Sequence, residues 1–405
     1  MRTLSPNSSG AALSKSEGVM HITPPRSHRF VVLDALRGIA ALFVVAFHLP
    51  RQMTSPLSAQ GPLAVDFFFC LSGFVIAFSY EGRLASNVSF KDFAVARLIR
   101  LYPIYAAGSL LGLSLGAFTA HFASHRGWSW AFFSPWVFLT FLATFLWPTC
   151  LSTANHSFNY PLDVPAWSIF YEIVANLAYA LLVRLRLSRT FVILSVVVVS
   201  FAPLFESVAL RGRPLDFGSQ PAGFGLGFPR VAFSFFIGVL VHRAYRRHHA
   251  HTKERESRSF SACVVSMALL LILSAPLPWM RAGVPQLIGV AVCFPLIVYY
   301  GTRAQLPHAF ARFATALGEL SYPLYLLHFP FILLMNTQHF HRLMAEHPTI
   351  LRLLVPCFVL ALAAAAWQVG EHIDLPARRA LTRLYNNHKQ RLAENLPQHL
   401  RPESR

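Results

Sequence analysis

The sequence contains few charged side chains and very few acidic ones. Only 13% of its 405 residues are Asp, Glu, Lys or Arg, and only 17 are acidic, whereas soluble proteins average about 25% charged residues. In contrast, 55% of the residues are hydrophobic and the mean hydropathy is +0.47. This balance excludes an ordinary soluble globular protein, and we expect a polytopic membrane protein.

Cysteines and a cleavable leader are also scarce or absent. The five cysteines are scattered, and their spacings fit neither a disulfide framework nor a metal site. Residues 1–30 are polar and rich in Ser and Pro, and they lack the short apolar region and small-residue cleavage site of a signal peptide. We therefore expect no bound metal, and we expect the first membrane helix to stay in the mature protein.

Basic residues outnumber acidic ones by 35 to 17, which gives a net charge of +18. They do not form one nucleic-acid-binding patch, because they gather in short loops and at the two ends of the chain. This is the arrangement of cytoplasmic loops in membrane proteins. It predicts that both termini are cytoplasmic, that the number of membrane crossings is even, and that no nucleic acid is a partner.

Eleven apolar runs are candidates for membrane helices. They lie near 31–49, 62–80, 102–121, 131–147, 165–183, 190–206, 223–242, 261–279, 285–301, 319–336 and 351–369. Because the number of crossings must be even, we expect the Trp- and Phe-rich run 131–147 to lie in the outer interface or to re-enter. The sequence predicts an all-α bundle of about ten transmembrane helices. It occupies residues 31–376, between a flexible tail (1–30) and a basic cytoplasmic tail (377–405).

The first apolar run contains two polar residues that are costly in a membrane, Arg37 and His48. Eleven residues of helix bring them back to within about 20° of one another, about 16 Å apart along the axis. One interpretation is that they anchor the two ends of a membrane helix. The other is that a cation and an imidazole on one stripe face polar partners inside the bundle.

A second polar stripe occurs in SYPLYLLH, residues 321–328. Ser321, Tyr325 and His328 are spaced to share one helical face, and Pro323 weakens the backbone hydrogen bonding near its start. The set could make hydrogen bonds within the core between helices. The presence of His48 elsewhere favours a functional role for the stripe.

Two of the carboxylates inside apolar runs, Glu172 and Asp66, are candidate site residues. Glu172 shares a helical face with Ser168 and must be neutral, paired or solvated at membrane depth. A structural ion pair between Glu172 and Arg37 remains an alternative to a functional role. Asp66 begins the second run, and it could orient His48 because the two helices are joined by a short loop.

Two further pairs have both a structural and a functional interpretation. Ser72 and Gly73 fit close packing of a neighbouring helix. Arg97 and Arg100 lie three residues apart where the third run begins. They fit simple anchoring at the cytoplasmic face, and equally a clamp for the phosphates of a cytoplasmic cosubstrate.

Taken together, five motifs resemble the membrane-bound acyltransferase family 3, bacterial enzymes that O-acylate surface polysaccharides, lipopolysaccharide and Nod factors. The motifs are LDALRGIAALFVVAFH, VDFFFCLSGFVI, ARLIRLYPIY, WSIFYEIVANLAY and SYPLYLLHFP. They occur in the family's order between about residues 31 and 330. The closing GEHIDLP resembles the end of the family's last helix. Cys70 and Ile169-Phe170 depart from the family's usual residues, but neither change removes a titratable group.

The resemblance implies an O-acyltransferase of the bacterial inner membrane that moves an acyl group, most simply acetyl, from cytoplasmic acyl-CoA to a carbohydrate hydroxyl. It implies that Arg37 and His48 are the paired motif of the first helix, with His48 handling the proton or the acyl group. Arg97 and Arg100 would bind acetyl-CoA or another acyl-CoA. The reaction cavity would be lined by Glu172, Ser321, Tyr325 and His328.

The rival hypothesis is a proton-coupled transporter or flippase of a glycan or lipid-linked precursor. In such a protein the same intramembrane Arg, His and Glu residues would bind the substrate and relay protons. The sequence contains no detectable inverted repeat, which weighs against this class. The carbohydrate and membrane lipid are the expected partners under either hypothesis.

Overall fold

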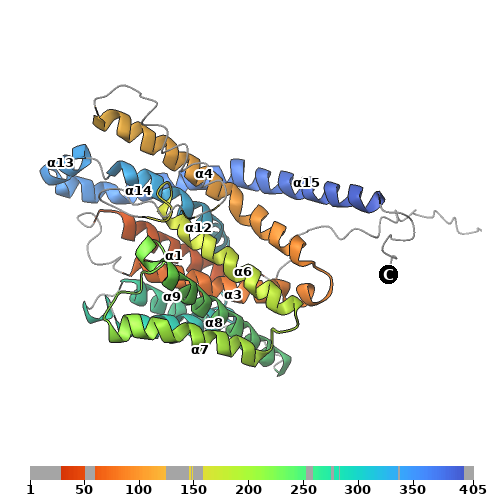
Figure 1. The fold of residues 1–405 in the computed structure, drawn as a ribbon. Coiled ribbons are helices and arrows are strands. Elements are labelled where there is room, and N and C mark those ends of the chain that lie inside the picture. Colours follow the sequence, from red (N-terminus) through yellow and green to blue (C-terminus); the bar gives the residue numbers. More distant parts are fainter. Residues whose placement is uncertain are drawn as a thin grey trace, which may run out of the picture.

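The computed structural model of the chain is a bundle of helices (Figure 1). It describes residues 29–50, 60–124, 146, 148, 158–251, 259–274, 278–281, 283–335 and 338–395, and these contain no strand. The α-helices are α1 (Val31–His48), α3 (Gly61–Ser86), α4 (Phe90–Ser124), α6 (Trp167–Arg184), α7 (Thr190–Phe205), α8 (Phe224–His251), α9 (Ser259–Ser274), α10 (Val284–Ile288), α11 (Phe294–Gly301), α12 (His308–Met335), α13 (Gln338–Glu346), α14 (Pro348–Val369) and α15 (Leu375–Glu394).

The long helices follow the apolar runs because a bilayer requires about 20 consecutive apolar residues per crossing. Nine helical segments of the described chain are long and apolar enough to cross a membrane. The shorter α9 has 16 residues, which is about 24 Å of helix. These ten elements correspond to the ten runs other than 131–147, and that run lies outside the described residues except for Leu146. The predicted all-α membrane bundle is confirmed.

Short non-α turns interrupt or precede several of these helices. The 3₁₀ turns are Val164–Ala166, Pro221–Gly223 and Pro278–Arg281, and the π-helical turns are Glu206–Leu210, Gly289–Cys293 and Gly370–Asp374. The last π turn joins α14 to α15, so the helix continues through the domain boundary predicted at residue 376. Beyond it, α15 extends away from the bundle (Figure 1). It is held to the start of α4 by an ion pair of 3.0 Å between Lys389 and Asp92.

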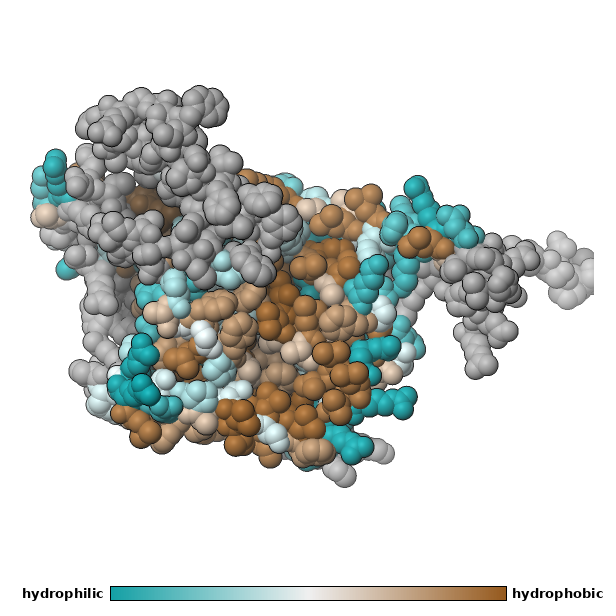
Figure 2. Space-filling model, in the orientation of Figure 1, coloured by the Kyte–Doolittle hydropathy of each residue, from teal (hydrophilic) through white to brown (hydrophobic). Residues whose placement is uncertain are grey.

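The outer surface has the polarity expected of a membrane-embedded bundle. Figure 2 shows a face that is hydrophobic across its centre, with hydrophilic residues gathered toward its two sides. Large apolar side chains on the outer surface are mostly exposed. Val199 on α7 is 71% exposed and Leu353 on α14 is 72% exposed. An aliphatic surface of this extent is unfavourable in water and is stable in lipid.

Helices α3 and α8 approach so closely that glycine is required on both. A Cβ at Gly73 would lie 1.9 Å from the carbonyl oxygen of Phe235, and a Cβ at Gly238 would lie 1.9 Å from that of Cys70. Small residues at such crossings let backbones touch where there is no hydrophobic effect to hold the helices together. The packing interpretation of Gly73 is therefore confirmed, whereas its neighbour Ser72 points elsewhere, toward Glu172.

We expect Gly73→Ala to destabilise the protein by about 1–3 kcal/mol, because the new methyl group meets backbone rather than a movable side chain. The matched control is Gly82→Ala near the end of the same helix, where an added Cβ meets nothing within 4 Å. Alanine is the better helix former, so the control should be neutral or slightly stabilising. Unfolding midpoints measured in one detergent provide the comparison. Equal midpoints for the two variants would contradict the close crossing.

Candidate active site

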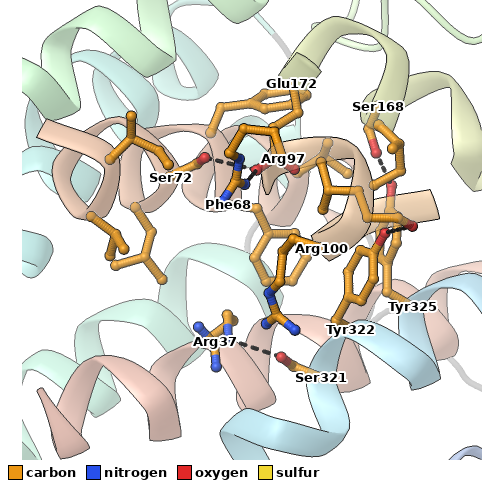
Figure 3. Close-up of a pocket in the computed structure, with 17 residues that line it drawn as sticks. Arg37, Phe68, Ser72, Arg97, Arg100, Ser168, Glu172, Ser321, Tyr322 and Tyr325 are labelled. Carbon is orange, nitrogen blue, oxygen red and sulfur yellow. Dashed lines mark hydrogen bonds and ion pairs between the residues drawn. The ribbon is translucent and has the colours of Figure 1, made fainter. Parts of the chain in front are cut away.

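Five helices of the bundle enclose a polar chamber with about 860 Å³ of empty space (Figure 3). Arg37 from α1, Ser72 from α3 and Arg97 and Arg100 from α4 reach into it. The chamber is also lined by Ser168 and Glu172 from α6 and by Ser321, Tyr322 and Tyr325 from α12. Most of the site residues predicted from sequence therefore line one space, although they are up to 288 positions apart in the chain (37 to 325). The volume lies within the usual range for small-molecule sites.

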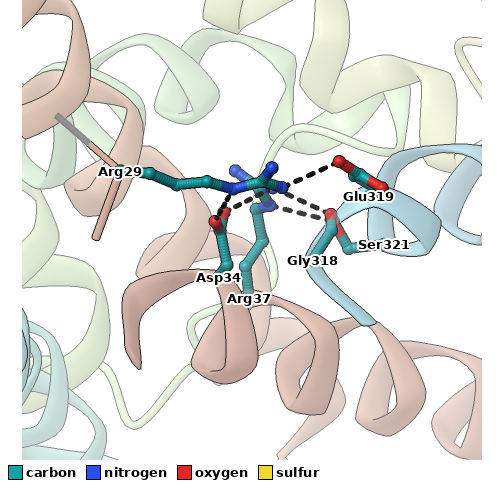
Figure 4. A network of polar contacts seen from close by, with 6 residues as sticks. All are labelled: Arg29, Asp34, Arg37, Gly318, Glu319 and Ser321. Atoms are coloured by element: carbon teal, nitrogen blue, oxygen red, sulfur yellow. Dashed lines mark hydrogen bonds and ion pairs between the residues drawn. The ribbon is translucent and has the colours of Figure 1, made fainter. Parts of the chain in front are cut away.

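Arg37 is held by a network between α1 and α12 (Figure 4). Its guanidinium donates to the Ser321 hydroxyl at 2.9 Å, to the Gly318 carbonyl at 2.8 Å and to the Asp34 carboxylate at 2.9 Å. Arg29 completes the network by bridging Asp34 at 2.8 Å. The side chain is thus aimed across the bundle at α12, and the interpretation of Arg37 as an interfacial anchor is wrong.

Glu172 pairs with α4 rather than with α1. The Ser72 hydroxyl donates to its carboxylate at 2.8 Å, and the Arg97 guanidinium lies 3.4 Å from the same oxygen. The alternative of a structural ion pair between Glu172 and Arg37 is therefore wrong. Nε of Arg97 is buried and has no hydrogen-bond partner within the part of the chain that the structure describes. Arg97 therefore has a donor left over for an anion.

Arg100 reaches the same chamber from one turn further along α4. Its guanidinium lies over the Tyr322 ring, with 5.8 Å between the guanidinium carbon and the ring centroid. No carboxylate of the described residues lies within ion-pairing distance of Arg100. Tyr322 is fixed in turn, because its hydroxyl donates to the Leu101 carbonyl at 2.6 Å. This leaves a full positive charge at the chamber wall, which suits a phosphate.

Tyr325 closes the far end of the chamber. Its hydroxyl lies 2.8 Å from that of Ser168, and it also reaches the Pro165 carbonyl at 3.2 Å. The Phe68 ring packs edge-on against it, with 5.7 Å between centroids. On the other side of Tyr325, the ring of His328 lies 6.1 Å away. Tyr325 therefore stands between the arginines and the histidines.

The two predicted histidines form a pair beyond Tyr325, at the end of α1. Nε2 of His328 lies 3.2 Å from Nδ1 of His48. Nδ1 of His328 lies 3.1 Å from the Leu324 carbonyl, so in the neutral ring it carries the proton and Nε2 is an acceptor. Nδ1 of His48 also lies 2.9 Å from the Val44 carbonyl. Nδ1 of His48 therefore faces two acceptors, the Val44 carbonyl and Nε2 of His328, and in the neutral ring it carries the proton. Nε2 of His48 then keeps a free lone pair, as a general base requires.

The prediction that Asp66 orients His48 is wrong. Both carboxylate oxygens of Asp66 accept hydrogen bonds from Arg230 on α8, at distances between 2.7 and 3.1 Å, and Ser234 donates at 3.1 Å. Asp66 is completely buried and Arg230 is 1% exposed. The pair lies within the α3–α8 interface, where its role is to hold the fold. The carbonyl of Val44 and the ring of His328 position His48 instead.

One buried carboxyl outside the membrane spans was not singled out from the sequence. Asp163 precedes the 3₁₀ turn that leads into α6, it is 1% exposed, and neither of its oxygens has a hydrogen-bond partner within the described ranges. Burial raises the pKa of the Asp163 carboxyl well above its usual range. Burial therefore favours the neutral form of this carboxyl, which lies beside Gly108 of α4 and Leu326 of α12.

No group of three or more His, Cys, Asp or Glu residues in the described part of the chain could hold a metal ion. The arrangement that the structure does offer is different. Guanidinium groups and Tyr325 line the chamber, whereas the imidazole pair of His48 and His328 lies outside its lining, on the other side of Tyr325. Such a site can hold an anionic group on one side of Tyr325 and move a proton on the other.

Comparison with known proteins identifies the family of the chain. Residues 30–368 match the family described as "Acyltransferase domain". The chain belongs to this acyltransferase family. The match spans α1 to α14, so it includes every helix that lines the chamber. The family resemblance drawn from the five motifs is confirmed, and the protein is a membrane acyltransferase.

Among curated proteins, the acyltransferase is similar to "Protein 2 in picA locus" of Rhizobium radiobacter. The two are 37% identical over 172 residues, which cover 40% of this chain and 85% of that protein. No solved structure matches the chain.

Proposed function

We propose that this acyltransferase is an O-acyltransferase of the bacterial inner membrane, with both termini in the cytoplasm. The donor is a cytoplasmic acyl-CoA, most simply acetyl-CoA, and the acceptor is a hydroxyl of a cell-surface or exported carbohydrate. The observation that carries the proposal is the order of groups on the two sides of Tyr325. Arginines with spare donors line the chamber with Tyr325, and an imidazole with a free lone pair lies behind Tyr325, outside the chamber lining.

In this proposal the arginines bind the donor. The pyrophosphate of acyl-CoA contacts Arg97 and Arg100, since guanidinium groups form strong bidentate hydrogen bonds with phosphate oxygens. The thioester arm then lies along the chamber toward Tyr325. Arg37 lines the same wall, where its network with Ser321 keeps the guanidinium in place.

The proposed chemistry is attack of the acceptor hydroxyl oxygen on the thioester carbonyl carbon. As the new C–O bond forms, the hydroxyl proton passes to Nε2 of His48. The C–S bond then breaks and the proton passes to the CoA sulfur, which leaves as the thiol. A hydroxyl is too weak an acid to ionise beforehand, so the base must act during attack. The Tyr325 hydroxyl now donates to the Pro165 carbonyl at 3.2 Å, and in this proposal it turns its proton to the developing oxyanion.

The donor site is tested with purified protein, labelled acetyl-CoA and extracted surface glycan. Arg97→Ala/Arg100→Ala is expected to raise KM for acetyl-CoA by about 10- to 100-fold, because charge-assisted hydrogen bonds to phosphate are lost. The matched control is Arg312→Ala, an exposed arginine at the start of α12, which should leave KM unchanged. An unaltered KM in the double variant would overturn the donor site. Absence of ester formation from any acyl-CoA in the wild type would overturn the donor class.

A further inference from the structure

A second cavity adjoins the arginine chamber. It contains about 900 Å³ of empty space, and it shares Arg37, Arg100 and Tyr322 with the first chamber. Its remaining wall comes from α12 and from the end of α14, the π turn and the first turn of α15. Pro323, the helix-loosening proline of α12, also lines it. Two adjoining cavities that share a wall can hold two parts of one elongated ligand.

Tyr322 at the junction is flanked by two guanidinium groups. Arg100 from α4 and Arg378 from α15 lie over the same ring, at 5.8 and 5.9 Å from its centroid. Arg378 is largely buried, with 14% of its side chain exposed, and it forms an ion pair with Asp374. Its Nε has no hydrogen-bond partner in the described chain. Arg378 therefore keeps a donor for an anion at the junction.

The second cavity also contains groups that suit a purine. Trp367 of α14 lines it and is only partly buried, so one aromatic surface is available for stacking. The exposed carboxylate of Glu371, in the π turn, is an acceptor for an exocyclic amine. π turns within α-helices are frequent at functional sites. An aromatic surface, an acceptor and a cluster of arginines are the recognition groups of a phosphorylated nucleoside.

We propose that the second cavity binds the nucleotide part of the donor, an adenosine carrying a ribose 3′-phosphate. Adenine stacks on Trp367, the 3′-phosphate contacts Arg378, and the pyrophosphate spans to Arg100 in the first chamber. This inference rests on the proposed acyl-CoA donor and deepens it. The family match ends at residue 368, so it includes Trp367 but does not cover the π turn or Arg378 of α15.

The electrostatic balance of the cavity agrees with this ligand. Arg29 and Arg37 are already paired with Asp34, whereas Arg100 has no ion-pair partner among the described residues. Arg378 has one carboxylate, Asp374, for a guanidinium that can make five hydrogen bonds. Phosphate groups would neutralise Arg100 and use the spare donors of Arg378. A neutral ligand would leave both unsatisfied.

The test compares acetyl-CoA with acetyl-pantetheine, which lacks both the pyrophosphate and the 3′-phosphoadenosine. Arg378→Gln is expected to raise KM for acetyl-CoA about 10-fold or more, with kcat unchanged and with no effect on acetyl-pantetheine. Trp367→Leu should act in the same direction. Arg379→Gln, an exposed arginine one position further along α15, is the matched control and should not change KM. Asp374→Asn/Arg378→Gln removes both charges of the pair and should behave like Arg378→Gln.

Two outcomes would overturn the inference while leaving the proposed function intact. One is an equal KM for acetyl-CoA in Arg378→Gln and wild type. The other is an equal rise for both donors, which would place the effect outside the nucleotide. Failure of the proposed function would instead appear as no turnover of either thioester by the wild type. Binding of adenosine 3′,5′-bisphosphate to the purified protein then decides, because the inference requires that Arg378→Gln weakens it and Arg379→Gln does not.

Discussion

His48→Ala is expected to lower kcat for acyl transfer by about 10²- to 10⁴-fold, the range in which a general base contributes. The reason is the tautomer set by the pair, in which Nδ1 of His48 faces the Val44 carbonyl and Nε2 of His328. Nε2 of His48 is then the one ring nitrogen of the pair left free to take a proton. KM for the donor should change little, because the proposed phosphate site at Arg97 and Arg100 is separated from His48 by Tyr325. Single-turnover rates at saturating acetyl-CoA provide the measurement.

His328 should matter less than His48 and in a different way. His328→Leu removes one acceptor beside Nδ1 of His48, but the Val44 carbonyl remains as the other. We therefore expect kcat to fall by about 10-fold, because the base is less well positioned. His308→Ala, an exposed histidine at the start of the same helix, is the matched control and should retain full activity. Ester formation by His48→Ala at the wild-type rate would remove His48 as the base. A loss in His328→Leu as large as in His48→Ala would transfer the role to the pair.

The sequence predicts the membrane helices well because their length and apolarity are imposed by the bilayer. The first run was placed at 31–49 and the helix is Val31–His48. The spacing of residues within one helix predicts equally well which of them share a face. Ser321, Tyr325 and His328 share α12. Ser321 and His328 meet α1, through Arg37 and His48, and Tyr325 meets α6, through Ser168. Helical periodicity predicts which residues share one face of a helix, but it does not predict which residues of other helices they contact.

Partners across helices could not be predicted in the same way, because they depend on how the bundle packs. Asp66 was assigned to His48 through the short loop between their helices, yet it pairs with Arg230, which is 164 positions away. A signal for Arg230 existed, since an arginine in an apolar run needs a partner by the same reasoning that singled out Glu172. Arg378 falls in the predicted basic tail, because nothing in the sequence shows that α15 continues α14 and that its first turn lines the second cavity.

Arg230→Met is expected to destabilise the protein by about 3–5 kcal/mol, the cost of leaving a buried charge without its partner. Arg230 also contacts several groups other than Asp66. It donates to the carbonyl of Phe217 at 2.8 Å and to that of Pro62 at 2.9 Å, and its guanidinium lies 5.3 Å from the Trp167 ring. It therefore joins α8 to α3, to the loop before α8 and to the start of α6. Unfolding in mixed micelles, followed by tryptophan fluorescence, measures the loss.

The double variant Asp66→Leu/Arg230→Met separates the charge from the contacts. Because replacing a buried ion pair by apolar side chains of similar volume is often neutral, the double variant should recover much of the stability lost in either single variant. The carbonyls of Phe217 and Pro62 lose their donor in both cases, so recovery should be incomplete. Arg211→Met removes an exposed ion pair with Glu206 and should cost less than about 1 kcal/mol. If Arg230→Met were no more harmful than Arg211→Met, the pair would not hold the fold. The geometry of Asp66 would then need a functional explanation after all.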